Sequence, residues 1–435
     1  MRGLPGLLAF AALIATPAAA QLSPAEQVIV ETVEAHHEAD IALLERLVNQ
    51  NSGTHNHAGV KAVADMLAPE FEALGFEVEW IDQSAAGRAG HLFARHEGKP
   101  STTRMLLIGH LDTVFEPSSP FQTFVREGDR GIGPGAEDMK GGDVVILAAL
   151  RAMKAAGTLQ DANIVVAMTG DEEDAGDPLD AARADLIAAG EWADVALGFE
   201  ALAKIDGRDM SSVARRSSNS WQLEATGKTG HSSGIFQEQV GYGAVYEMAR
   251  ILDAFRRKLP EENLTFNVGF MAGGTPAEVG EDGLSASTVG KTNIIPSKAV
   301  AKGDLRTLTQ EQTDRIVAAM QAIVDQNLPG TDATISFDFR YPAMAPTQGN
   351  RDLLAKLNAI NADLGLERME EFPPSRRGAA DISFVAPLVG AALAGMGADG
   401  AGGHAEGEYV DLPSMIRQAQ RAAILMSRLS QEPRD

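Results

Sequence analysis

Residues 105–112 read MLLIGHLD, an apolar run followed by a glycine, a histidine and an aspartate. Four consecutive large apolar residues are typical of a strand that is buried on both faces of a sheet. Two later apolar runs, 164–168 and 195–199, also lead into carboxylate residues. Because ligands of an open α/β sheet bind beyond the carboxyl ends of its strands, these polar side chains are expected to meet in one site.

Five short stretches carry the side chains of this expected site: Gly109–Asp112, Ala136–Gly142, Gly170–Glu173, Phe199–Glu200 and Gly403–Glu406. The first four each follow a β-like run, which for the second stretch is the run 123–125. Together they supply two imidazoles and several carboxylates, a ligand set suited to a pair of zinc ions. The sequence therefore predicts a single metal site at the strand ends.

The composition excludes several other classes of protein. A chain of 435 residues is too long for one ordinary core and indicates two domains, or one domain with a large insertion. A formal net charge of -23 argues against nucleic acid as a partner, since phosphate binding needs clustered basic residues. There is no cysteine, so any metal must be held by histidines and carboxylates.

The N-terminus has the parts of a secretory signal. A basic start at Met1–Gly3 precedes the apolar stretch Leu4–Ile14, and Ala18–Ala20 offers an Ala-x-Ala cleavage site. We expect the mature protein to begin at Gln21, in the periplasm of a bacterium or outside the cell. No later segment offers about 18 uninterrupted apolar residues, so no membrane attachment is expected after cleavage.

Periodicity predicts an α/β domain that a second domain interrupts. Its expected helices are 24–47, 58–74, 142–156, 351–364 and 413–429, and its expected strands include 76–81, 90–96, 104–109 and 162–168. Strand and helix signals from 221 to 339 predict an inserted α+β domain with an antiparallel sheet, its elements being 221–226, 240–255, 264–270, 299–306, 310–326 and 333–339. The expected organisation is a signal at 1–20, a catalytic domain at 21–210 and 344–435, and an inserted domain at 211–343.

Each candidate site residue also fits an ordinary structural role. His110 and Asp112 point the same way on an extended strand end, so His110 would bind metal while Asp112 orients its ring. The alternative for this pair is a turn histidine with a capping aspartate. Asp138, just before the helix expected at 142, is either a carboxylate that bridges two metal ions or a helix N-cap.

The remaining metal-site candidates have comparable alternatives. Adjacent Glu172 and Glu173 point in different directions, so one would bind metal while the other faces the substrate as a general base. The alternative is a solvated acidic loop. Glu200 and His404 are either metal ligands or ordinary loop residues.

Three residues of the expected inserted domain are candidates for substrate binding. His231 would supply a positive or hydrogen-bonding group, and Arg306 would bind a carboxylate through two parallel hydrogen bonds. Asn293 precedes Ile294–Pro296. A surface histidine, a strand-end salt bridge and a turn asparagine are the alternatives.

The ordered set of five stretches resembles the co-catalytic zinc exopeptidases and deacylases. This family includes bacterial glutamate carboxypeptidases, acetylornithine deacetylases, succinyl-diaminopimelate desuccinylases and aminoacylases, and the resemblance runs from about residue 25 to 430. It implies an α/β fold with a phosphorylase/hydrolase-like sheet sandwiched by helices. It also implies an inserted α+β, ferredoxin-like lid through which two subunits form a homodimer.

The resemblance further implies a role for each candidate residue. Two Zn²⁺ ions per subunit are implied, one held by His110, Asp138 and Glu200, the other by Asp138, Glu173 and His404. Glu172 resembles the general base, Asp112 resembles the residue that orients His110, and the Asp138–Met139 peptide bond is expected to be cis. His231, Asn293 and Arg306 resemble the residues that bind the substrate carboxylate and the developing oxyanion, His231 reaching into the neighbouring subunit.

Details of the sequence favour one branch of that family. The features that look most like glutamate carboxypeptidases are Glu200, Thr292–Pro296 and Gly407–Asp411. Two features depart from that branch: Arg376–Asp381 replaces the usual glycine-rich turn, and Tyr341 stands where the branch carries an arginine. The expected function is a carboxypeptidase that releases a C-terminal amino acid from a small peptide. An N-acyl amino acid deacylase or dipeptidase with the same mechanism is the alternative, and an exported binding module without catalysis is a third hypothesis.

Overall fold

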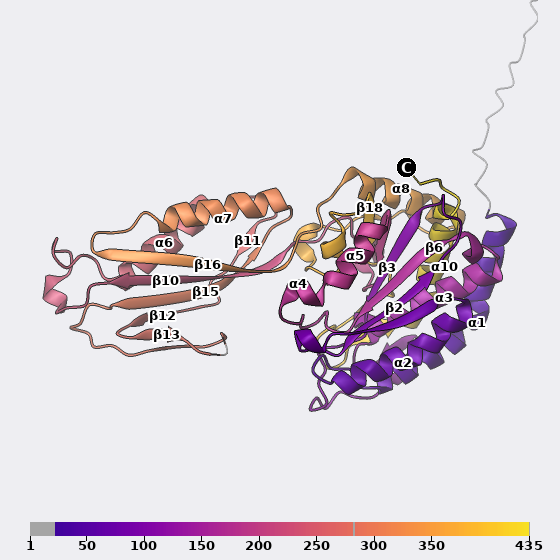
Figure 1. Cartoon of the computed structure of the whole chain (residues 1–435), viewed down its shortest axis with the longest axis horizontal. Helices are drawn as coiled ribbons and strands as arrows, with labels where there is room; N and C mark the ends of the chain where they lie inside the picture. The colour runs from indigo at the N-terminus through magenta and orange to yellow at the C-terminus, as the bar shows by residue number, and fades with distance from the viewer. Residues whose placement is uncertain (1–21, 282, 435) are drawn as a thin grey trace, which may run out of the picture.

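The computed structural model describes residues 22–281 and 283–434, and the expected signal at 1–20 lies outside them. Figure 1 shows two bodies joined by a narrow connection: a helix-covered sheet, and an elongated sheet with two helices on one side. The second body extends from β10 (Ser218–Gly227) to β16 (Thr331–Tyr341). The chain enters and leaves it at the end of its sheet next to the first body (Figure 1).

The first body is built on a six-stranded mixed sheet. Its order is β1 (Glu77–Asp82), β2 (Gly90–His96), β6 (Asn163–Thr169), β3 (Arg104–His110), β7 (Val195–Gly198) and β18 (Ala391–Ala394). The strands β6, β3, β7 and β18 run parallel, while β1 and β2 are antiparallel to their neighbours. All seven residues of β6 are buried, as expected for a strand covered on both faces.

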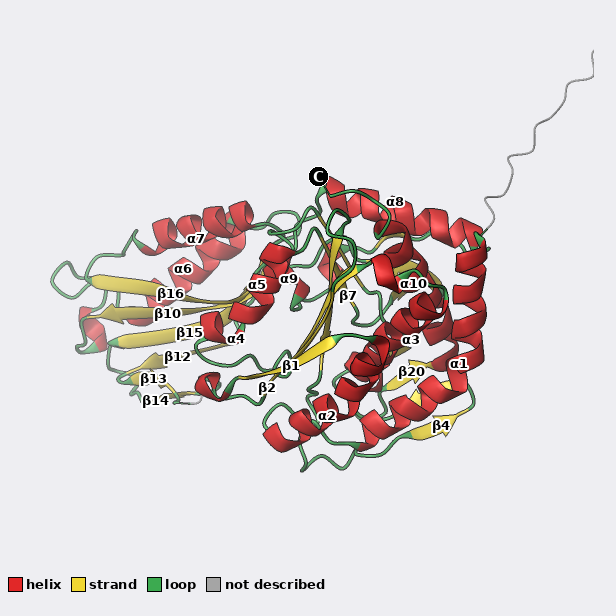
Figure 2. Ribbon diagram, turned by 45° about the vertical axis from the view of Figure 1, so that its right-hand side comes forward, coloured by secondary structure: helices red, strands yellow, loops and turns green. Residues whose placement is uncertain are grey.

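Helices cover both faces of this sheet (Figure 2). Leu107 faces the larger core, formed with α1 (Pro24–Asn49), α2 (His57–Leu74), α3 (Gly141–Ala155), α8 (Gln348–Asp363) and α10 (Leu412–Leu429). Its neighbours Leu106 and Ile108 face the opposite core, formed with α5 (Ala184–Trp192) and α9 (Ile382–Val385), beside which lies α4 (Leu179–Ala182). This alternation follows from the period of two of a β-strand.

Two small sheets border the first body. One joins β8 (Ala203–Ile205), β9 (Arg208–Ser211) and β17 (Glu370–Glu371); the other joins β4 (Val125–Glu127), β5 (Arg130–Ile132), β19 (Gly400–Ala401) and β20 (Tyr409–Asp411). The loop between β19 and β20 carries His404. Pairing of β20 with β5 places that loop beside the turn that leads into α3.

The second body has its own sheet and its own core. The sheet order is β11 (Thr265–Phe266), β15 (Lys298–Arg306), β10 and β16, and β12 (Phe270–Gly274) also pairs with β15. All of these pairings are antiparallel. The helices α6 (Ala244–Lys258) and α7 (Gln310–Val324) pack on one face, where Phe255 of α6 and Met320 of α7 share a core with Trp221 of β10. A hairpin of β13 (Ala277–Val279) and β14 (Ala286–Thr288) lies beyond β12.

The expected fold class is confirmed, but several elements differ from the expected ones. The run 123–125 is not a core strand, because β4 lies in a small border sheet and Asp138 instead follows β5. The helix expected at 240–255 begins at Ala244, since Gly241 and Gly243 adopt positive φ angles of 83° and 74°. The strand expected at 264–270 is divided into β11 and β12, and the β13–β14 hairpin was not predicted.

Among residues 22–281 and 283–434, the helices lack the combination of length and apolar character that crossing a bilayer requires.

Candidate metal and catalytic site

The carboxyl ends of three neighbouring parallel strands bring the expected site residues together. His110 is the last residue of β3, Glu172 and Glu173 follow the end of β6, and Glu200 lies two residues beyond β7. Because the three strands are parallel, their carboxyl ends lie at one edge of the sheet. The polar residues therefore converge although they are far apart in sequence.

The carboxylate of Asp138 lies between two imidazoles. Its Oδ1 is 3.2 Å from Nε2 of His110, and its Oδ2 is 3.3 Å from Nε2 of His404. Nε2 of His404 is also 3.0 Å from Oε2 of Glu173. Ligand atoms of His110, Asp138 and Glu173 lie within 4.8 Å of one another. One carboxylate thus faces both histidines, as a bridging ligand must.

The turn that carries Asp138 is held by a carboxylate from the far end of the chain. Asp138 belongs to a single π-helical turn, Ala136–Lys140, that leads into α3. Glu408 accepts hydrogen bonds from the backbone N–H groups of Gly135, Glu137 and Asp138 at 3.3, 2.8 and 3.0 Å. The peptide bond between Asp138 and Met139 is cis, as expected.

Asp112 is completely buried and organises both sides of the site. Its carboxylate accepts hydrogen bonds from the Thr54 hydroxyl at 2.6 Å and from the backbone N–H groups of Glu172 and Glu173 at 3.0 and 3.1 Å. Its Oδ1 is 3.5 Å from Nδ1 of His110, which is itself 3.1 Å from the Asp112 carbonyl oxygen. Asp112 therefore connects the His110 ring to the backbone of the two glutamates.

The electrostatics indicate that the site needs a cation. Burial and the charge of Glu200 raise the pKa of Glu172 well above its usual range. Hydrogen bonds to Asp138 and Glu173 raise the pKa of His404 to about 11, so protons on imidazole offset part of the negative charge. A bound metal would take over that role, because metal ligands must be deprotonated.

The donor set fits a metal centre. Oε1 of Glu173 is buried and has no hydrogen-bond partner among the described residues. Two imidazoles and several carboxylates surround it, and no cysteine occurs in the chain. Nitrogen and oxygen donors of this kind suit zinc, with an unpaired buried oxygen available to complete its coordination.

Glu200 lies beside this group but is engaged elsewhere. A cavity of about 10 Å³ is lined by side chains that include His110, Glu172, Glu200 and Asp381. The Oε2 atom of Glu200 accepts a hydrogen bond from Nη1 of Arg215 at 2.7 Å. The structure therefore places Glu200 at the site, with its Oε2 held by Arg215.

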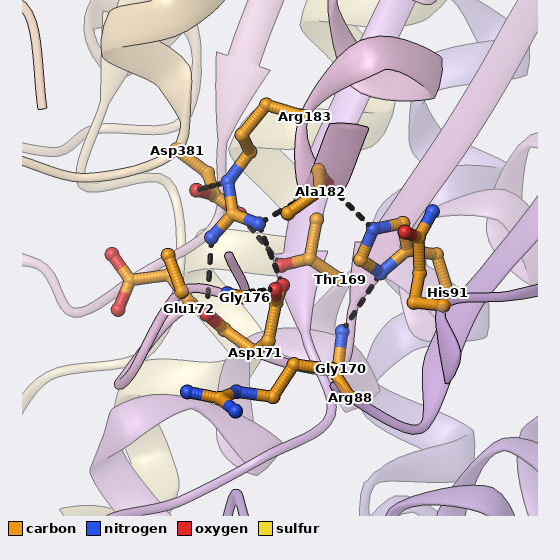
Figure 3. A network of polar contacts seen from close by, with 12 residues as sticks. Arg88, His91, Thr169, Gly170, Asp171, Glu172, Gly176, Ala182, Arg183 and Asp381 are labelled. Carbon is orange, nitrogen blue, oxygen red and sulfur yellow. Dashed lines mark hydrogen bonds and ion pairs between the residues drawn. The ribbon is translucent and has the colours of Figure 1, made fainter. Parts of the chain in front are cut away.

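A buried network supports the backbone of Glu172 (Figure 3). The Arg183 guanidinium is fully buried and donates to Asp171 Oδ1 at 2.6 Å, Asp381 Oδ1 at 2.8 Å and the Tyr341 hydroxyl at 3.0 Å. Tyr341, the last residue of β16, donates in turn to the Glu172 carbonyl at 2.7 Å. Figure 3 shows the carboxylate of Glu172 pointing away from Arg183.

The three expected substrate-binding residues lie in two separate places. Arg306 ends β15 next to the first body; a Cβ placed on Gly378 would lie 3.9 Å from its Nη1. His231 and Asn293 lie together, since the Ser232 N–H donates to the Asn293 carbonyl at 2.9 Å. This pair lies beyond the distal end of β10, roughly 30 Å from the connection, given about 3.3 Å per strand residue. Within one chain, His231 and Asn293 therefore lie far from the candidate metal ligands.

Sequence reasoning missed several residues of the site. No role was predicted for Glu408, Arg183, Arg215 or Thr54. Tyr341 and the segment around Asp381 were noted only as departures from the family pattern. In the structure Glu408 and Arg183 are fully buried, and buried charged residues usually have a charged or hydrogen-bonding partner. Their burial is known only from the structure, so the sequence offered no direct signal for either residue.

Residues 106–428 match the pattern of peptidase family M20/M25/M40. The chain belongs to this family. The resemblance inferred from the five stretches is therefore confirmed, and so is the expectation that the protein is a metallohydrolase acting on amide bonds.

Similarity to individual proteins extends over most of the chain. Carboxypeptidase G2 of Pseudomonas sp. (strain RS-16) is 27% identical over 433 residues, which is 96% of each chain. Succinyl-diaminopimelate desuccinylase of Paracoccus denitrificans (strain Pd 1222) is 29% identical over 306 residues, or 68% of this chain and 75% of the other.

Solved structures have the same fold. Aminopeptidase PepT of Bacillus cereus ATCC 10987 has a TM-score of 0.70 at 18% identity, covering 91% of this chain and 99% of that one. The Bacillus subtilis YXEP protein, a dinuclear metal-binding peptidase, has a TM-score of 0.63 at 14% identity, covering 92% and 99%.

The Tyr341 hydroxyl can be tested by removing it. In Tyr341→Phe, we expect kcat for an amide substrate to fall roughly tenfold, because the Glu172 backbone loses a fixed partner and a buried Arg183 donor is left unpaired. KM and metal content should stay unchanged, as should all three quantities in the exposed control Tyr246→Phe. Steady-state kinetics and metal analysis check this, and an unaltered kcat would show that the hydroxyl does not position Glu172.

Proposed function

We propose that this protein is an exported dizinc carboxypeptidase that releases a C-terminal amino acid from a small peptide. The observation that carries the proposal is the Asp138 carboxylate between His110 and His404, with Glu172 lining the adjoining cavity. Similarity to carboxypeptidase G2 over 96% of both chains supports the choice of reaction.

The residues that would hold the metal follow from this arrangement. His110, Asp138 and Glu200 would hold one zinc ion, and Asp138, Glu173 and His404 would hold the other. Zinc bound there would polarise the substrate carbonyl and bring the pKa of bound water near neutrality.

Glu172 is the residue that moves protons in this proposal. It accepts a proton from the attacking water and delivers it to the leaving amine, a role for which a raised pKa is suited. Asp112 holds the backbone N–H of Glu172 and the His110 ring in one geometry. Arg306 binds the free carboxylate of the substrate through a planar pair of donors.

The position of His231 supports a homodimer through the second body. His231 is exposed, and its Nδ1 is 2.8 Å from the Ser233 hydroxyl, far from the metal ligands of its own chain. In a two-fold dimer, His231 and Asn293 would reach the partner's site and stabilise the developing oxyanion there. Phe236 and Phe339, which are 55% and 53% exposed, offer apolar surface for such an interface on the same body.

An N-acyl amino acid deacylase or dipeptidase is the second candidate. The succinyl-diaminopimelate desuccinylase relatives favour it, as does Tyr341 in a position where glutamate carboxypeptidases carry arginine. A substrate panel separates the carboxypeptidase from this second candidate. The zinc-loaded protein is incubated with matched dipeptides, longer peptides and N-acyl amino acids, and the products are identified by mass spectrometry. Release of a C-terminal residue from longer peptides supports the carboxypeptidase, and cleavage of N-acyl amino acids alone supports the deacylase.

Export is part of the proposal and rests on the sequence of residues 1–20. We expect the protein expressed with its full N-terminus to be recovered outside the bacterial cytoplasm with Gln21 as its first residue, since Ala18–Ala20 fits the cleavage site. Fractionation with N-terminal sequencing measures this. Recovery of the uncleaved chain in the cytoplasm would contradict export.

Glu172→Gln tests the general base. We expect kcat to fall about 10²–10⁴-fold, because the amide cannot accept a proton. Bound metal and the circular dichroism spectrum should be unchanged, and the exposed control Asp180→Asn should keep full activity. Activity near that of the wild type, or loss of zinc from the variant, would refute the assignment.

Mixing two inactive variants tests the dimer. Glu172→Gln and His231→Ala homodimers should each be nearly inactive, while random subunit exchange makes half of the dimers mixed. Each mixed dimer has one site with both residues intact, so activity should recover to about a quarter of the wild-type value for a two-fold dimer. If tagged pull-down shows exchange but activity does not recover, His231 does not act in the partner's site.

A further inference from the structure

His91 is completely buried on β2, and both of its ring nitrogens are engaged (Figure 3). Nε2 lies 2.9 Å from the carbonyl oxygen of Ala182, and Nδ1 lies 3.2 Å from the backbone nitrogen of Gly170. A carbonyl can only accept and a backbone N–H can only donate, so Nε2 carries the hydrogen and Nδ1 is the acceptor. The ring therefore joins two segments in one defined tautomer.

The contact with Gly170 begins where the ladder between β2 and β6 stops. The last paired residues at this end of the two strands are Leu92 and Met168. Beyond them, the Gly170 N–H finds its acceptor in the His91 side chain. One imidazole thus takes over from the ladder just before the segment that carries Glu172.

Gly170 lies tightly against β2. A Cβ at this position would be 2.2 Å from the carbonyl oxygen of Gly90 and 2.7 Å from Cγ1 of Val60, so only glycine fits. The next two residues are Asp171 and Glu172, the proposed general base. A displacement of Gly170 would be passed along the chain to Glu172, because the backbone has only two soft dihedral angles per residue.

The other partner of His91 leads to the buried arginine of the same network. Ala182 ends α4 and directly precedes Arg183. Arg183 donates to Oδ1 of Asp171 at 2.6 Å and to the carbonyl oxygen of Asp171 at 3.0 Å. His91 consequently contacts the residue before Asp171 and the residue before Arg183, so it fixes both halves of this ion pair relative to each other.

Other contacts hold the same segment from other elements of the first body. The Thr169 hydroxyl donates to Asp381 at 2.6 Å, and Asp112 accepts from the backbone N–H of Glu172 at 3.0 Å. Asp381 precedes α9, and Asp112 follows β3. His91 supplies the contact from β2.

We propose that His91 is a positioning residue that sets the orientation of Glu172 through the backbone N–H of Gly170. The inference rests on the proposed function, in which Glu172 is the general base. In this role His91 restricts the backbone that carries the base and touches no reacting atom. A general base must lie within hydrogen-bond reach of the proton that it accepts, so its orientation affects the rate of proton transfer. The expected signature is a lower kcat with an unaltered KM.

Two amide side chains separate the two contacts of the ring. In the rotamer of His91, asparagine places its amide oxygen near the position of Nδ1, whereas glutamine places its amide nitrogen near that of Nε2. His91→Asn therefore retains the acceptor for Gly170 and loses the donor to Ala182, whose carbonyl oxygen still lies 3.3 Å from Nη1 of Arg183. His91→Gln retains the donor to Ala182 and leaves the Gly170 N–H unpaired.

The two variants should differ in turnover. We expect His91→Gln to lower kcat for an amide substrate roughly tenfold, the rate equivalent of one hydrogen bond, with KM and metal content unchanged. His91→Asn should stay within about threefold of wild type, because the buried N–H remains paired. Equal losses in the two variants, or no loss in either, would overturn the inference.

A second histidine of the same strand provides the matched control. His96 is the last residue of β2, at the end opposite to His91, and its Nδ1 lies 2.9 Å from the carbonyl oxygen of Ala162. His96→Gln should keep the wild-type kcat. A loss in His96→Gln as large as that in His91→Gln would show a general effect of β2 and overturn the assignment to the Gly170 contact.

Hydrogen exchange tests the contact without turnover. Measured by mass spectrometry, the segment 169–176 should exchange at least about tenfold faster in His91→Gln than in wild type, and at about the wild-type rate in His91→Asn. If no amide is cleaved but this difference is found, the contact stands and the proposed function fails. If amides are cleaved and exchange is alike in all three proteins, the inference is overturned and the proposed function is unaffected.

Folding of the variants is checked independently. The circular dichroism spectrum and the bound metal should match those of wild type. Should His91→Gln not fold, His91→Asn decides instead: kcat and exchange near the wild-type values support the contact with Gly170, and a tenfold loss of kcat overturns it.

Discussion

The geometry of the site depends on one carboxylate, Asp138, shared between two imidazoles. One imidazole ends a central strand, and the other belongs to a loop near the C-terminus, so that both parts of the first body must be folded before the three groups meet. Glu408 adds to this dependence, because its carboxylate holds the turn of Asp138 and lies only four residues beyond His404. The C-terminal segment therefore supplies both a metal-site histidine and the support of the bridging carboxylate.

The same site is coupled to the second body through its connecting segments. Tyr341 ends the last strand of that body and contacts the backbone of Glu172, while Arg215, just before its first strand, pairs with Glu200. Reorientation of the second body would therefore act on the proposed general base and on a proposed zinc ligand. The two bodies are therefore connected by a hydrogen bond and an ion pair at the site as well as by the chain itself.

The second body carries the proposed substrate-binding residues at both of its ends. Arg306 lies at the end that faces the metal ligands, whereas His231 and Asn293 lie at the distal end. Near its own candidate metal ligands, one chain consequently places the arginine proposed to bind the substrate carboxylate, but not the residues proposed to stabilise the oxyanion. This division is the physical reason for proposing that a complete site is formed by two chains.

The sequence by itself determined the fold class and the set of candidate metal residues. Apolar runs that end near His110, Glu172 and Glu200 placed these three residues, because parallel strands bring their carboxyl ends to one edge of a sheet. Asp138 and His404 lie beside strands of a border sheet, and their roles came from the family resemblance. Local signals were weaker for β11 to β14, which are only two to five residues long, and there the periodicity did not predict the correct elements. The tertiary structure alone decided which charges are paired. Three pairings illustrate this: Glu408 with the Asp138 turn, Arg183 with Asp381, and Arg215 with Glu200. A buried charge requires a partner, but the sequence does not specify where in the chain that partner lies.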